Sequence, residues 1–110
     1  MQAFEQSILA FFEHLPSYYG CQVELAVALC DEPDADLTRA SWSLSQFQLV
    51  RAAYRHQGDR LMIEGPQMYY EMSAEKLCLF EQKGAHQFEF TEAYSGHTLR
   101  LTRMTFTPDR

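Results

Sequence analysis

Three residues of complementary chemistry, Glu81, His86 and Arg103, fall where predicted hairpins would set them side by side. If Lys83-Gly84 closes one hairpin, Glu81 lies opposite His86; if residues 93–96 close the next, His86 lies opposite Arg103. Such a row could bind an anionic head group, or support acid–base chemistry in which the carboxylate orients the imidazole. The alternative interpretation is a solvated polar rim, because charged pairs beside turns are common and contribute little.

The row depends on a strand register that is set by five turn signals, Gly58-Asp59, Gly65-Pro66, 73–76, Lys83-Gly84 and 93–96. Closing each turn with a short loop places apolar residues opposite one another: Tyr54 with Ile63, Ile63 with Met68, Tyr70 with Leu79, Leu79 with Phe88, and Phe90 with Leu99. A one-residue slip would turn a strand over, so the agreement favours this register. The predicted apolar face contains Tyr54, Leu61, Ile63, Met68, Tyr70, Met72, Leu77, Leu79, Phe88, Phe90, Leu99 and Leu101.

The segments before these hairpins supply a helix and further strands. Residues 2–14 have helical spacing of apolar side chains, and Pro16 ends the helix; the apolar side chains are Phe4, Ile8, Phe11, Phe12 and Leu15. Residues 21–30 alternate with the period of a strand. Residues 37–57 can form either one helix or two strands, and the register of Val50, Ala52 and Tyr54 favours strands.

Together these elements predict an α+β fold in one domain, residues 1–110. An N-terminal helix packs on a curled antiparallel β-meander of six to eight strands, which forms a partly closed barrel or cup. The helix covers the mouth of the cup or enters it, since neither apolar surface can stay in water.

Two predicted sites follow from this fold. Tyr54 and Met68 lie in line with Glu81, His86 and Arg103, so these five residues form the predicted ligand site, an apolar body with one polar end. On the opposite, polar face, Tyr69 would lie beside Phe80. An exposed aromatic pair is typical of a contact surface, so this pair is the predicted anchor of a symmetric dimer. Glu92 and His97 are interpreted only as a pair flanking a turn.

Composition narrows the classes of function. The net charge of −6 argues against nucleic-acid and membrane-surface binding, and no apolar run could span a bilayer. An odd number of cysteines, with no signal peptide in residues 1–15, favours free thiols and a cytoplasmic protein. The spacing of cysteines and histidines predicts no metal site, and no cofactor motif is present.

The sequence therefore leaves three hypotheses. The first is a small, soluble, non-enzymatic protein that binds an apolar or amphipathic ligand in the cup. The alternative is a homodimeric protein–protein interaction module, adaptor-like or chaperone-like, that uses Tyr69 and Phe80. The third is a small enzyme that uses Glu81, His86 and Arg103, ranked last because no nucleophile motif accompanies them.

Overall fold

The computed structural model describes residues 3–31, 41–55, 59–94 and 98–108. The chain begins with helix α1 (Ala3–His14) and the short 3₁₀ helix η1 (Leu15–Tyr18). Eight strands follow: β1 (Gln22–Asp31), β2 (Trp42–Gln48), β3 (Arg51–Arg55), β4 (Arg60–Gly65), β5 (Met68–Ser73), β6 (Leu77–Gly84), β7 (Gln87–Tyr94) and β8 (Thr98–Thr107).

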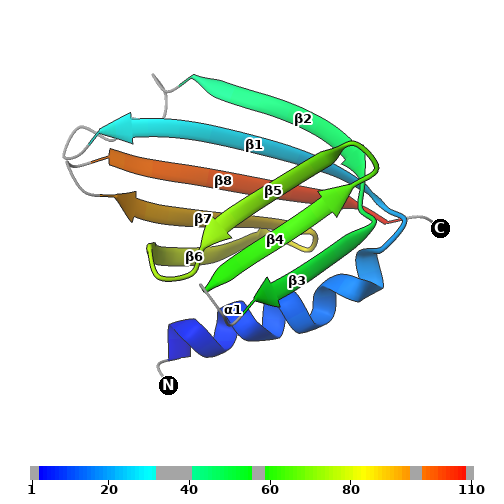
Figure 1. Cartoon of the computed structure of the whole chain (residues 1–110), viewed down its shortest axis with the longest axis horizontal. Helices are drawn as coiled ribbons and strands as arrows, with labels where there is room; N and C mark the ends of the chain where they lie inside the picture. Colours follow the sequence, from blue (N-terminus) through cyan, green and yellow to red (C-terminus); the bar gives the residue numbers. More distant parts are fainter. Residues whose placement is uncertain (1–2, 32–40, 56–58, 95–97, 109–110) are drawn as a thin grey trace.

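The strands form two antiparallel sheets. The larger has the order β2-β1-β8-β7-β6, and the smaller has the order β3-β4-β5. The smaller sheet lies across one face of the larger, with its strands running diagonally over those beneath (Figure 1). The predicted α+β class and antiparallel strands are confirmed, but the sheets do not close into a barrel.

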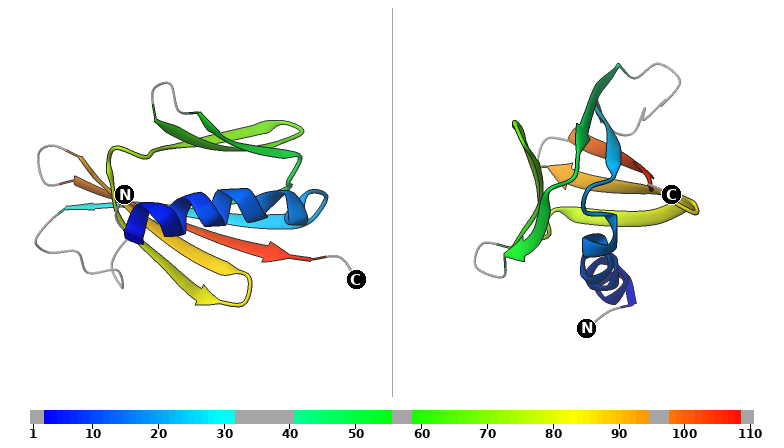
Figure 2. Two further views of the ribbon diagram at one scale, coloured as in Figure 1. Left: turned by 90° about the horizontal axis from the view of Figure 1, so that it is seen from below. Right: turned by 90° about the vertical axis from the view of Figure 1, so that its right-hand side faces the viewer.

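Helix α1 covers the side of the molecule where the edge strands β3 and β6 approach it (Figure 2). Its apolar stripe is buried as the helical spacing predicts, through Ile8, Phe11 and Phe12, and Leu15 continues it at the start of η1. The helix ends at His14, and Pro16 lies in the first turn of η1, where its missing N–H costs no hydrogen bond. The side chain of Phe4 lies outside the described residues.

The ambiguous segment 37–57 contains strands where it is described, namely β2 and β3. Leu49 joins them and is fully buried. Gly65 allows the two sheets to approach closely at this corner, because a Cβ there would lie 2.7 Å from Cδ2 of Phe47.

The register of the smaller sheet differs from the predicted one by two residues. Tyr54 lies opposite Leu61, and Ile63 lies opposite Tyr70. Each turn was centred one residue away from its true position; for example, the β4–β5 turn consists of Pro66 and Gln67 rather than Gly65 and Pro66. A shift of two residues leaves every side chain on its predicted face, so the apolar face of this sheet was assigned correctly.

The predicted pairing between β5 and β6 is wrong, because these strands belong to different sheets. Consequently Tyr70 does not pair with Leu79, nor Met72 with Leu77. Residues 74–76 carry the chain from one sheet to the other. In place of the predicted continuous meander, β1 pairs with β8 along its whole length, so the first strand lies beside the last.

The predicted registers of β6 and β8 against β7 are each wrong by three residues, an odd number. Phe88 and Phe90 of β7 are buried as predicted, but most residues of β6 and β8 lie on the face opposite to the predicted one. Phe80 lies opposite Phe90, and Phe90 opposite Thr102. Phe80 therefore packs against the core, whereas Leu79 is 47% exposed. Leu99 and Leu101, predicted in the core, lie on the outer face of the larger sheet.

The reason is that both faces of β8 are apolar, and the bulkier set is buried. Met104 and Phe106 share a face with Thr102 and are almost fully buried, so burying Leu99 and Leu101 instead would expose them. A register shift between Leu77 and Leu79 also lets Leu77 and Phe80 both face inward, which no count of alternating residues anticipates.

Candidate functional site

The observed register does not bring Glu81, His86 and Arg103 into one row. Glu81 lies opposite Glu89 and forms an ion pair of 3.4 Å with the ammonium of Lys83. Glu89, in turn, lies opposite Arg103, with 2.6 Å between its Oε2 and the guanidinium Nε.

The remaining contacts of Arg103, and the position of His86, also differ from the predicted row. The Arg103 guanidinium also lies over the ring of Trp42, 4.9 Å from its centre. Arg103 and Glu89 are thus on the outer face of the larger sheet, whereas His86 is in the β6–β7 turn. The prediction of this row is wrong, because the turn consists of Ala85 and His86 rather than Lys83 and Gly84.

The other predicted site residues are also separated. Tyr54 and Met68 lie in the smaller sheet and pack against the core. Tyr69 is 49% exposed on β5, where its hydroxyl donates to the Glu71 carboxylate. Phe80 belongs to the aromatic core around Phe11, so it is not beside Tyr69.

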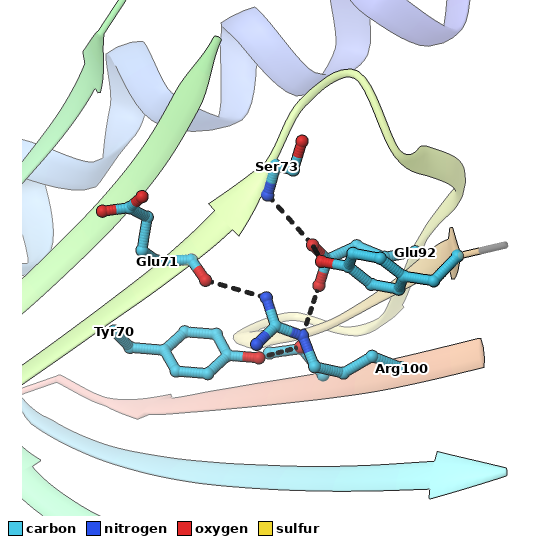
Figure 3. A network of polar contacts seen from close by, with 7 residues as sticks. Tyr70, Glu71, Ser73, Glu92 and Arg100 are labelled. Atoms are coloured by element: carbon cyan, nitrogen blue, oxygen red, sulfur yellow. Dashed lines mark hydrogen bonds and ion pairs between the residues drawn. The ribbon is translucent and has the colours of Figure 1, made fainter. Parts of the chain in front are cut away.

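A buried polar network joins the two sheets where β5 meets β7 and β8 (Figure 3). At its centre the carboxylate of Glu92 is 0% exposed. Its Oε2 accepts from the backbone N–H of Ser73 at 2.9 Å and from the hydroxyl of Tyr94 at 2.6 Å. Its Oε1 accepts from Nε of Arg100 at 2.7 Å. A buried charge of this kind is stable only when it is paired and hydrogen-bonded.

Arg100 extends the network to the backbone of β5. Its Nη2 donates to the carbonyl oxygen of Glu71 at 2.8 Å, and its guanidinium lies 5.1 Å from the ring centre of Tyr70. The Tyr70 hydroxyl bonds Oγ1 of Thr102. We call these seven residues the Glu92 network: Tyr70, Glu71, Ser73, Glu92, Tyr94, Arg100 and Thr102.

Three ionisable side chains of the network have shifted pKa values. Burial and the hydrogen bond to Glu92 raise the pKa of Tyr94 to about 12. Burial likewise raises the pKa of Tyr70. Burial alone would lower the pKa of Arg100, but the hydrogen bond to Glu92 and the neighbouring tyrosines outweigh it and raise that pKa. Each shift keeps these groups in their ordinary ionisation states at neutral pH.

The Glu92 network connects the two sheets and leaves no space in which a substrate could bind. Both oxygens of Glu92 are occupied by protein donors, and the side chain is inaccessible to water. The sequence did contain a signal for it, since Glu92 and Arg100 are oppositely charged residues on adjacent strands. That signal was missed because the short-loop register set Glu92 beside His97, which lies outside the described residues.

A groove between α1 and the β6–β7 hairpin is the candidate binding site. Its volume is about 420 Å³, within the range usual for small-molecule sites. Phe11, Phe80 and Phe88 lie along it, with ring centres of Phe11 and Phe88 separated by 4.7 Å. We call it the α1–β6 groove; its lining residues are Ser7, Ala10, Phe11, His14, Tyr18, Phe80, Gln82, Ala85 and Phe88.

Polar groups gather where α1 ends. The hydroxyl of Tyr18 lies 2.9 Å from Nδ1 of His86, and the Tyr18 ring stacks on Phe106 at 4.3 Å. Burial raises the pKa of Tyr18, so its hydroxyl is neutral at physiological pH. Nε2 of His14 lies 3.2 Å from Oγ of Ser17, which donates to the His14 carbonyl. The groove therefore offers apolar surface along its length and imidazole and hydroxyl groups at one end.

Comparisons with protein-family models, with curated proteins and with solved structures found no match to this chain. Within the described residues, no three His, Cys, Asp or Glu side chains are grouped so that they could hold a metal ion. No disulfide joins the described cysteines, of which Cys21 is buried and Cys78 is exposed. None of the described helices is both long and apolar enough to cross a bilayer.

Proposed function

We propose that this chain is a non-enzymatic binding protein that holds a small apolar or amphipathic molecule in the α1–β6 groove. The observation that carries the proposal is the groove itself, with phenylalanine rings along it and polar side chains at one end. Small-molecule sites commonly combine mostly apolar walls with a few polar groups that fix orientation. The apolar part of the ligand would lie on Phe11, Phe80 and Phe88, with its polar end toward His14 and Tyr18.

The groove replaces the cup as the binding site, because the space between the sheets is filled. Leu61, Ile63, Met72, Phe90 and Met104 are each at most 1% exposed and pack together there. Of the sequence-predicted site residues, His86 remains close to the groove through its bond to Tyr18. The enzymatic hypothesis depended on the Glu81–His86–Arg103 row, and nothing in the observed register favours it.

Titration with decanoate, an amphipathic ten-carbon carboxylate, tests the proposal by NMR of ¹⁵N-labelled protein. We expect chemical-shift changes concentrated at Ala10, His14 and Ala85, with a Kd of about 1 mM or lower for a ligand of this size. Ala10→Trp should abolish these changes by filling the groove. The matched control is Gln6→Trp, on the same helix but not among the lining residues, which should bind like wild type.

Circular dichroism of both variants establishes that they remain folded. Decanoate shifts that spread over the whole chain, or that persist in Ala10→Trp, would exclude the groove as the binding site. An absence of any shift in the wild-type protein would exclude this class of amphipathic ligand and contradict the proposal.

A further inference from the structure

Strand β2 is an edge strand with no charged residue and no proline in its sequence, Trp42 to Gln48. It pairs with β1 on one side, and no described strand pairs with its other side. Leu44, near its middle, is 66% exposed, and Ser43, Ser45 and Gln46 are also exposed. Exposed edges of this type are templates for pairing with another strand, and proteins usually block them.

At the other three edges of the two sheets, other parts of the chain hinder pairing with a further strand. On β3, the hydroxyl of Tyr19 accepts from the backbone N–H of Ala52 and donates to its carbonyl. On β5, Arg100 donates to the carbonyl of Glu71 and Ser73 donates to Glu92.

The β6 edge carries two register shifts and charged side chains, and it lies against α1. Bulges, charges and covering elements all discourage pairing at an edge. Among the described edges, β2 is therefore the one left open to a partner.

The hydrogen bonds next to β2 show which of its backbone groups point to the open side. Leu49 donates to the carbonyl of Cys21, which continues the β1–β2 ladder and sets its phase. Because antiparallel ladders alternate, Phe47, Ser45 and Ser43 bond to β1. The N–H and C=O groups of Trp42, Leu44, Gln46 and Gln48 are then directed away from it.

We propose that a second copy of this chain pairs with β2, antiparallel, about a two-fold axis at Ser45. This register sets Leu44 opposite Gln46 of the partner copy, so the outward-directed groups at the middle of β2 are matched. Trp42 lies opposite Gln48, whose carbonyl also lies beside Gly65 of its own chain. The two Leu44 side chains become diagonal neighbours on one face, which buries the most exposed large apolar residue described. The two five-stranded sheets would join into one continuous sheet.

A second copy fits this edge better than a charged peptide does. β2 contains no charge for such a peptide to pair with. A two-fold axis brings each residue near its own counterpart, which a charged strand would oppose through like-charge repulsion. The interface is small, so we expect dimers at micromolar concentrations that dissociate on dilution.

Cysteine cross-linking tests the register directly. Across the two-fold axis, the two Ser45 residues form a pair that is not hydrogen-bonded, with Cα atoms about 4.5 Å apart, within disulfide range. In protein carrying Cys30→Ser and Cys78→Ser, Ser45→Cys should form covalent dimers at least ~10-fold faster than the control Ser43→Cys, which faces Phe47 of the partner copy. Equal rates, or no cross-linking by either, would overturn the proposal.

Sedimentation of the uncross-linked protein supplies the second test. Wild-type protein should be dimeric at roughly 100 µM, and Gln46→Pro should be monomeric, because it removes an outward N–H and leaves the ladder to β1 intact. If Gln46→Pro does not fold, Leu44→Lys replaces it, with Leu79→Lys on β6 as the matched control. Wild-type monomers at this concentration, or equal loss of dimer in both lysine variants, would refute pairing through β2.

Discussion

The substitution Glu92→Gln tests whether the Glu92 network holds the two sheets together. The change keeps the shape of the side chain but removes its charge and replaces one acceptor oxygen with an NH₂ donor. Ser73 and Tyr94 both donate to Oε2, whereas Arg100 donates to Oε1. Whichever way the amide is oriented, at least one donor therefore faces another donor.

The expected loss in the free energy of unfolding is about 2–4 kcal/mol. Removing one partner of a fully buried ion pair costs ~3–5 kcal/mol, because the other charge is left unpaired. The Arg100 side chain is 24% exposed and can regain some water, which lowers the cost. The loss of one hydrogen bond to a charged acceptor, worth ~1.5–3 kcal/mol, gives a similar figure.

Urea denaturation measures this loss through the fluorescence of Trp42, the one tryptophan of the chain. The matched control is Glu64→Gln, the same chemical change at an exposed ion pair with Arg51, where the distance is 3.1 Å. Exposed pairs contribute little, so the control should differ from wild type by less than about 1 kcal/mol.

Two results would contradict this reasoning. If Glu92→Gln is as stable as Glu64→Gln, the contribution of the Glu92 network to the free energy of unfolding does not depend on the charge of Glu92. If the denaturant slope m changes strongly together with the midpoint, the variant has altered the compactness of one state, and the loss cannot be assigned to the network alone.

Three further predictions concern the core, the pH dependence and the corner between the sheets. Phe11→Ala should lower the free energy of unfolding, measured in urea, by ~3–5 kcal/mol, because its ring contacts several aromatic side chains and is 6% exposed. A negligible loss would contradict the packing of α1 against the core. The raised pKa of Tyr94, about 12, means that the unfolded chain loses this proton first, so stability should fall as pH rises from about 10 to 12. In Tyr94→Phe the free energy of unfolding, measured by denaturation at several pH values in this range, should fall less with pH than in wild type. A pH dependence equal to that of wild type would contradict the raised pKa of Tyr94. Gly65→Ala should lower the thermal midpoint, at a cost of ~1–3 kcal/mol, because its Cβ would lie 2.7 Å from Phe47 and 3.0 Å from the carbonyl of Gln48; a midpoint equal to that of wild type would show that this corner can relax.

The elements could be predicted from the sequence, whereas the register could not. The helix, a sheet of six to eight strands and the inward stripe of α1 follow from periodicity, from the turn signals and from Pro16; eight strands are observed. The side chains of β3, β4 and β5 were also assigned to the correct faces, because a register error of two residues does not move a side chain to the other face. The separation into two sheets left no signal, since residues 74–76 could equally close a hairpin.

The candidate site was missed because it lies between elements rather than within one. Phe11 and Phe80 are far apart in the chain, and only the path of α1 along β6 brings their rings within 5.5 Å. The pairing of Glu81 with His86 failed for a local reason. Gly84 suits a tight turn, but it is the last residue of β6, and Ala85 and His86 make the turn instead.

The buried ion pair explains why the true register of β8 is maintained against the predicted one. Burying the face of Leu99 and Leu101 would also remove two large apolar side chains from water, although it would expose Met104 and Phe106. A one-residue slip would, however, move Arg100 to the outer face and leave the carboxylate of Glu92 buried without its cation. Since an uncompensated buried charge costs several kcal/mol, the slipped register is excluded even though its apolar pairs look favourable. In this sheet the Glu92–Arg100 pair therefore adds to the burial of Met104 and Phe106 in selecting which face of β8 is inside.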